Sequence, residues 1–444
     1  MGGNSTFRGA EPTWANACVG NNGNPGYVEY SKGFSKAANL LINVVLQDGG
    51  LKFNVDDMVY PVCFNMRHSV ELRLKGEVEE LGKIAKKKGV KIEFDSASSH
   101  DIGNIWSFFK SKSEFLDYRF ISINRLIEPT IKDIASIDAT GQTFRYPVSN
   151  ESQKHLTDVS VINFVVLLHK FTELEKNLDQ LHVVSLYLGE EYGAGTFTNK
   201  LNRPQIYKVA KQLPLKSTWG AGILGNIKAK ICAEYVLSNN DFGKVLNIIK
   251  ENHYLSTLIG EPVPLLGVSD EQVLAYLDYW VKLHPIDNDA PDCEVYDFSE
   301  LSTEKMLADM SNSARVWAEV WADVGASLTP EIVAGLRALF YFSRDKHYVE
   351  YYKVIYDHEL EEQRHPGEMR RGFKHFLDKT NGLENVIISL FALGRAELAE
   401  ALLTEHRPNY SFIEDARSGK HVEPTQQVAY TLSRCEQVFL CNSS

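Results

Sequence analysis

The 444-residue sequence has few of the groups that bind metals, form disulfides or cross membranes. Its six cysteines include no Cys-x-x-Cys pair, and no histidine stands at zinc-ligand spacing from two of them, so we predict no structural metal site. No run of about 18 apolar residues occurs, so no membrane span is expected. The first residues lack the basic-then-apolar pattern of a secretory signal, and a reducing cytoplasm is the expected compartment.

The sequence also lacks a phosphate loop, and its strand-forming patterns are sparse. Gly189, Gly193 and Gly195 predict a hinge-like turn, but no Gly-Lys-Ser/Thr follows them. No nucleophile or cofactor-binding constellation stands out, so no cofactor is predicted. The net charge of −11 argues against a general polyanion binder, which limits any nucleic-acid surface to a local basic patch. The lysines between Lys83 and Lys91 offer one such patch, but they are more typical of a solvated helix end.

What is present is helical periodicity, clearest between Val59 and Leu81. The apolar residues of this stretch recur mostly every three or four positions, which is typical of a helix with one face in the core: Val59, Cys63, Met66, Val70, Leu74 and Leu81. Pro61 would fall in its first turn, where the missing N–H costs least. Four polar residues flank the stripe: Arg67, His68, Glu71 and Lys75. They indicate either an ion-pair ladder on a solvated flank or a basic rim facing a groove.

Neighbouring stretches supply the other helices of a predicted bundle: Tyr27–Leu46, a helix capped by Ser98 or Ser99, Phe115–Ile137 and Leu156–Leu181. His100 would lie in the first turn of the helix that Ser98 or Ser99 caps. There it would either belong to the cap or lie beside Arg67 or Arg145. Arg145, in the loop DATGQTFRYPVSN, is predicted either to be buried against a carboxylate or to contact a ligand.

The remaining sequence predicts further helical domains. Asn202 would cap a short helix stopped by Pro214, and Thr329 would cap another. Three stretches predict helical hairpins: AEYVLSNNDFGKVLNIIKEN, ALFYFSRDKHYVEYYKVIYD and SLFALGRAELAEALLTEH. We therefore predict an all-α protein with a flexible segment 1–26, a helical bundle 27–185, a middle helical region 186–285, an acidic linker 286–300 and a C-terminal helical domain 301–444.

Three motifs resemble a known family. YPVCFNMRHSVELRLKG, SHDIGNIWSFF and FRYP occur in that order within residues 27–182, and together they resemble bacterial helical domains related to the HEPN (higher eukaryote and prokaryote nucleotide-binding) family. The resemblance implies a helical bundle. It also implies either an RNase of a toxin or phage-defence system, or a bundle that binds RNA or a nucleotide without catalysis.

The sequence departs from the RNases of that family at the catalytic motif. Catalytic members carry Arg and His about four to six residues apart, whereas Arg67 and His68 are adjacent. The literal match, Arg370 and His375, lies far outside the bundle and is expected by chance, so we predict that both are structural.

We therefore predict that the protein is a cytoplasmic, non-catalytic HEPN-like module. It would bind RNA or a nucleotide in a bacterial defence or stress system. Its predicted ligand-binding residues are Arg67, His68, Glu71, Lys75, His100 and Arg145. A protein-interaction scaffold, with partners on the C-terminal helices, and an HEPN-type RNase are the alternatives. Convergence of these side chains in one pocket would favour the binding module, and dispersal would favour the scaffold.

Overall fold

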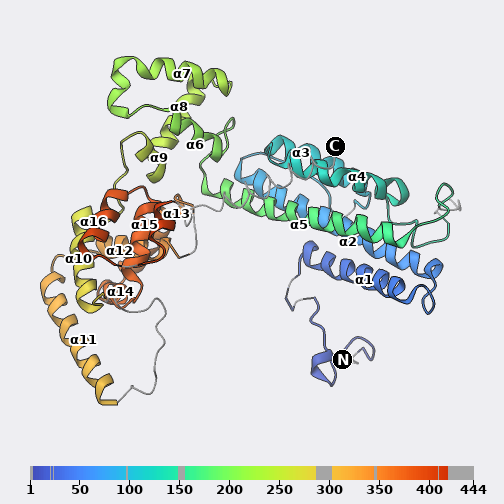
Figure 1. The fold of residues 1–444 in the computed structure, drawn as a ribbon, viewed down its shortest axis with the longest axis horizontal. Helices are drawn as coiled ribbons and strands as arrows, with labels where there is room; N and C mark the ends of the chain where they lie inside the picture. The colour runs from blue at the N-terminus through green and yellow to red at the C-terminus, as the bar shows by residue number, and fades with distance from the viewer. Residues whose placement is uncertain are drawn as a thin grey trace. The chain divides into compact units, whose positions relative to one another are not determined.

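The computed structural model describes residues 4–20, 22–23, 25–96, 99–148, 156–286, 303–344, 348–408 and 410–418. Across these ranges the regular elements are all helices and no strand is present, which confirms the all-α prediction (Figure 1). In the same ranges, no helix combines the length and the apolar character that crossing a bilayer requires. The chain divides into two compact units, the first ending at Glu190 and the second beginning at Glu191.

The first unit consists of long helices arranged around α2. Its elements are η1 (Thr13–Ala15), α1 (Tyr27–Asp48), α2 (Val55–Lys87), α3 (Ile102–Leu116), α4 (Phe120–Asp138) and α5 (Phe164–Ala194), the last of which runs past the boundary between the units. In Figure 1, α1 lies along one side of α2, and α3 and α4 lie on the other. Polar contacts join α5 to α2: the side chains of His182 and Ser185 both reach Glu77.

Helix α2 forms the centre of the predicted bundle, but it begins earlier than expected. The Asn54 side chain accepts a hydrogen bond from the Asp56 N–H, so the helix starts at Val55. Pro61 therefore lies inside the helix and not in its first turn. It is tolerated because it is exposed, where water can reach the unpaired carbonyl of the preceding turn. The predicted apolar stripe is buried except for Val59, which is partly exposed.

Two other helix starts differ from the prediction because a nearby side chain provides the cap. Asp101 accepts from the Asn104 N–H at 2.9 Å, so α3 begins at Ile102 and His100 precedes it. Ser98, the other predicted cap, is outside the described residues. Asn163 accepts from the N–H groups of the first turn of α5, so that helix starts at Phe164 and not at Leu156.

Two further boundaries also differ. The predicted helix Phe115–Ile137 is divided at Asp117, whose carboxylate binds the Arg119 N–H and thereby starts a new helix, α4, with Pro129 inside it. The predicted turn at Gly189, Gly193 and Gly195 is reduced to Gly195, which has a φ of +90°, because the other two glycines lie within α5.

Most helices of the second unit are shorter, with α11 (Thr303–Val324) as the exception. The helices are α6 (Arg203–Gln212), η2 (Lys216–Ala221), α7 (Ile223–Glu234), α8 (Asn239–Glu251), α9 (His253–Leu258), α10 (Asp270–Leu283), α11, α12 (Pro330–Phe342), α13 (Tyr351–Gln363), α14 (Glu368–Leu377), α15 (Gly382–Ala392), α16 (Ala396–His406) and α17 (Ile413–Arg417). The predicted caps Asn202 and Thr329 are both present. The three predicted hairpins correspond to α7 and α8, α12 and α13, and α15 and α16.

The second unit has two hydrophobic cores. One lies among α6 to α9, around Phe242 and Ile249. The other joins α10 to α11 through α16 and includes Trp280, Phe340 and Phe376. Helix α10 thus shares a core with helices that follow residue 301, across the boundary predicted near residue 285. Apart from residue 286, the predicted linker 286–300 lies outside the described residues.

Candidate functional site

A polar pocket of about 400 Å³ in the first unit brings together five of the six predicted site residues. Its lining comes from α2, from His100 just before α3, and from the loop after α4: Phe64, Arg67, His68, Glu71, His100, Thr140, Gly141, Gln142 and Arg145. Lys75 lies one turn further along α2 and reaches the pocket only through Glu71, at 3.0 Å. The predicted convergence is therefore found, with Lys75 behind the pocket wall.

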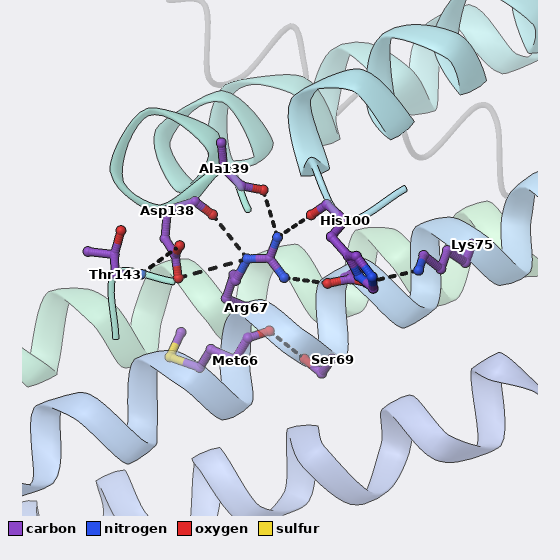
Figure 2. Close-up of polar contacts among 9 residues, drawn as sticks. Met66, Arg67, Ser69, Lys75, His100, Asp138, Ala139 and Thr143 are labelled. Atoms are coloured by element: carbon purple, nitrogen blue, oxygen red, sulfur yellow. Dashed lines mark hydrogen bonds and ion pairs between the residues drawn. The ribbon is translucent and has the colours of Figure 1, made fainter. Parts of the chain in front are cut away.

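Arg67, which is buried, forms the floor of this pocket. Figure 2 shows its polar contacts. Its side chain is 4% exposed, and its guanidinium donates to the main-chain carbonyls of Asp138 (3.0 Å), Ala139 (2.6 Å) and His100. A further N–H donates to the carboxylate of Glu71. The expected position at the margin of the core is wrong for Arg67, because the C-terminus of α4 covers it. The predicted ion-pair ladder is present, because Glu71 pairs with both Arg67 and Lys75, but it is buried and not solvated.

Glu71 is the acceptor on which the cationic side chains meet. Arg67, Lys75 and the Nδ1 of His100, 3.0 Å away, all contact its carboxylate. Burial alone would raise the pKa of Glu71, but the hydrogen bonds from these three side chains together hold it below its usual value. Glu71 is therefore ionised at neutral pH and compensates part of the buried positive charge.

The loop after α4 is fixed against Arg67 by Asp138 and Gly141. One carboxylate oxygen of Asp138 accepts from the Thr143 N–H at 3.1 Å, and the other lies 3.9 Å from the Arg67 Nε. Gly141 has a φ of +81°, and a Cβ at this position would lie 3.0 Å from Arg67 Nη1. Only glycine combines that backbone conformation with so close an approach to the guanidinium.

The rim of the pocket carries His68 and Arg145. His68 stacks parallel to Phe64, with ring centroids 5.7 Å apart, and contacts Phe34 edge-on. Burial lowers its pKa, and the neighbouring cations oppose its protonation, so His68 is neutral at pH 7. Arg145 is exposed, which rules out the predicted buried ion pair. Its guanidinium lies over the rings of Phe64 (5.6 Å) and Tyr146 (5.3 Å).

Asp138, Gly141 and Phe64 are parts of this site that the sequence did not reveal. The glycine of DATGQ indicates a turn, but no sequence pattern shows that the turn covers Arg67. Neither group of His, Asp and Glu side chains with metal-ligand spacing in the described ranges lies in the pocket.

Arg370 and His375, the literal match to the RNase motif, lie on α14 and contact different partners. Arg370 lies over the ring of Trp321 at 4.8 Å, and His375 is hydrogen-bonded to the Tyr341 hydroxyl at 3.1 Å. Both side chains contact aromatic residues of their own unit, which fits the structural role predicted for them.

The fold and the pocket define an all-helical protein whose first unit carries a polar pocket with an arginine on its rim. Comparisons with protein-family models, with curated proteins and with solved structures found no match. The HEPN-like resemblance therefore stays a prediction from the three sequence motifs.

Proposed function

We propose that the first unit binds a nucleotide or a short single-stranded RNA through the pocket around Arg67, and does not cleave it. The observation that carries this proposal is the position of Arg145. It is an exposed cation on the rim of a polar pocket, and none of the carboxylates in the described ranges lies within ion-pair distance of it. Arginine gives charge-assisted, often bidentate hydrogen bonds to phosphate oxygens, so Arg145 is suited to hold one.

The charge balance of the pocket also favours an anion. Arg67, Lys75 and Arg145 are cationic, and Glu71 and Asp138 are the carboxylates among them. One positive charge is therefore uncompensated, and it is the accessible one. A phosphate would meet Arg145 first, with the side chain of His100 also at the mouth, where it is 61% exposed. Local attraction of this kind does not depend on the net charge of the whole chain, which is negative.

The aromatic rings beside Arg145 offer a surface for a base. Tyr146 is about half exposed, and Phe64 lies on the pocket wall. Stacking of a base on such rings is worth about 1–3 kcal/mol and tolerates any sequence. A phosphate on Arg145 with its base on Tyr146 would use both features.

The same geometry argues against cleavage. The buried guanidinium of Arg67 is committed to three carbonyls and Glu71, and the ring of His68 is packed between Phe34 and Phe64. Neither group is free to assist attack on a phosphodiester. The resemblance to non-catalytic HEPN-like bundles agrees with this proposal, and a defence or stress role is proposed on that resemblance alone.

The test compares Arg145→Ala with Arg125→Ala by fluorescence anisotropy of a labelled oligouridylate, with ATP as competitor. Arg125 is an exposed arginine on α4 outside the pocket lining, and it serves as the matched control. We expect Arg145→Ala to weaken binding about tenfold or more, which is the loss of one charge-assisted contact. Arg125→Ala should leave binding within about twofold, and the RNA should remain intact on a denaturing gel.

Displacement of the RNA by ATP would identify the nucleotide as the minimal ligand. The proposal fails if the wild type binds neither probe, or if both arginine variants lose the same affinity. Cleavage of the RNA that disappears in Arg67→Lys or His68→Ala would instead support the RNase alternative.

A further inference from the structure

A second site, independent of the pocket, lies between α10 and α16 in the second unit. Asp278 on α10 faces Glu405 and His406 at the C-terminus of α16, and one ligand atom from each of the three lies within 4.8 Å of the others. We propose that these three side chains bind a divalent transition-metal ion, for which zinc is the best match.

The unpartnered nitrogen of His406 is the first reason. The His406 side chain is 8% exposed, and its Nε2 is buried without a hydrogen-bond partner. Leaving a buried polar atom unsatisfied costs roughly 1–3 kcal/mol, so such atoms usually face a group that binds them. This nitrogen points at Asp278, with 3.5 Å between Nε2 and Oδ1.

The distance between these atoms suits a bridging metal better than a direct bond. A hydrogen bond from an imidazole N–H to a carboxylate is usually about 2.7–3.2 Å long. In a tetrahedral zinc site with bonds of about 2.0–2.2 Å, two ligand atoms stand roughly 3.3–3.6 Å apart. The separation of 3.5 Å between His406 and Asp278 falls in the second range.

The other end of the same helix pair provides a contrast. Arg395, at the N-terminus of α16, forms a direct ion pair with Asp270, at the N-terminus of α10. The two helices are therefore tied at their starts by an ordinary salt bridge. Further along the same two helices, His406 and Asp278 stand 3.5 Å apart, which is longer than a usual hydrogen bond.

The chemistry of the donor set selects the class of ion. One imidazole nitrogen and two carboxylate oxygens suit zinc and neighbouring first-row ions, whereas calcium and magnesium prefer oxygen ligands alone. Asp278 is 46% exposed and Glu405 is exposed, so an ion can enter from solvent and keep a water molecule as its fourth ligand.

The chain offers a matched control in a second group, His358, Glu359 and Glu362 on α13. There the Glu359 carboxylate already accepts from Arg337, and the His358 side chain is 71% exposed. This group also combines one histidine with two carboxylates, but it lacks a buried, unpartnered nitrogen, so it should not form a comparable site.

The test is isothermal titration calorimetry of the full chain with zinc chloride, after metal removal and under a phosphine reductant. We expect one site in the wild type, affinity at least about tenfold weaker in His406→Ala and in Asp278→Asn, and no change in His358→Ala. Zinc should also raise the melting temperature of the wild type and of His358→Ala, but not that of the other two variants.

Asp278→Asn changes an exposed side chain and decides the matter if His406→Ala does not fold. Zinc affinity that is unchanged in Asp278→Asn, or no zinc binding by the wild type, would overturn the proposal. Calcium or magnesium binding as tight as that of zinc, and insensitive to His406→Ala, would also overturn it.

Discussion

Arg67 of α2 donates from its Nη2 to the main-chain carbonyl of Ala139 at 2.6 Å, and so caps the C-terminus of α4. The last carbonyls of a helix have no partner within it, and a cation placed there also meets the negative end of the helix dipole. The same guanidinium neutralises Glu71. One side chain thus joins α2, α4 and His100, two residues before α3.

Replacement of Arg67 by alanine should strongly destabilise the first unit. The change leaves Glu71 buried with Lys75 as its main cationic partner and removes the donors from the carbonyls of Asp138 and Ala139. We expect a loss of about 3–5 kcal/mol in the free energy of unfolding, measured by urea denaturation and followed by circular dichroism. Arg125→Ala, at an exposed site on α4, should stay within about 0.5 kcal/mol. A loss below about 1 kcal/mol for Arg67→Ala would contradict the anchoring role.

Gly141→Ala should be more harmful than Gly195→Ala, although both glycines have positive φ. An alanine at either position is strained by its backbone conformation, by about 1–2 kcal/mol. At Gly141 the new Cβ would also lie 3.0 Å from the Arg67 Nη1, whereas nothing lies within 4 Å at Gly195. Urea denaturation should show the larger loss for Gly141→Ala, together with weaker ligand binding. Equal losses would show that the loop does not depend on its close approach to Arg67.

The fold was predictable where periodicity and capping act locally, as in α2, α6 and the three hairpins. Helix starts were less predictable because several residues near each one can cap. Asp101 and Asn163 provided the caps at two of them, and nothing in the local sequence separates Asp101 from Ser99. The burial of Arg67 was not predictable from its place beside the apolar stripe, because the C-terminus of α4, about 70 residues later, covers it. Local spacing does not reveal such long-range contacts.

The site was predicted in composition but not in arrangement. Five of the six residues share one pocket, yet Arg67 and Glu71 form its buried floor and leave Arg145 as the accessible cation. Arg145 could not be placed from the sequence, because its loop lacks periodicity. Because Arg145 is exposed and Arg67 is buried, a ligand would meet Arg145, and Arg67 holds the helices together.

The His182–Glu77 contact predicts a pH dependence of stability in the first unit. The hydrogen bond from His182 Nδ1 to the buried Glu77 carboxylate, at 2.7 Å, raises the pKa of His182 above its usual value. A histidine whose pKa is higher in the folded state stabilises that state fully below its unfolded pKa, near 6.5, and loses this effect as the pH rises through the folded value. Stability relative to His182→Gln should therefore decrease as the pH rises above about 6.5.

The lowered pKa of His68 gives the stability the opposite pH dependence, but His68 is present in both the wild type and His182→Gln. The difference in stability between these two proteins therefore reports the His182–Glu77 contact. Denaturation curves taken across neutral pH would measure it. A difference that stays constant, or grows with pH, would contradict the assignment of the charged pair.

The last prediction concerns the pair Arg203 and Glu350 in the second unit. Arg203 is 1% exposed, and both its Nε and its Nη2 lie 3.2 Å from the Glu350 carboxylate. That carboxylate also accepts from Asn252, at 2.9 Å, and from the Thr196 hydroxyl. Glu350 thus joins residues before α6, in α6 and before α9.

Glu350→Ala should cost about 3–5 kcal/mol, because it removes the carboxylate that pairs with the buried guanidinium of Arg203. Glu361→Ala, at an exposed glutamate of α13, is the control and should stay within about 0.5 kcal/mol. The double variant Arg203→Met with Glu350→Gln removes both charges and should be less destabilised than the two single changes added together, because neither charge is then left unpaired. Urea denaturation of the wild type, Arg203→Met, Glu350→Gln and the double variant measures the coupling between the two side chains. Strict additivity would mean that the two side chains stabilise the unit independently and do not act as a pair.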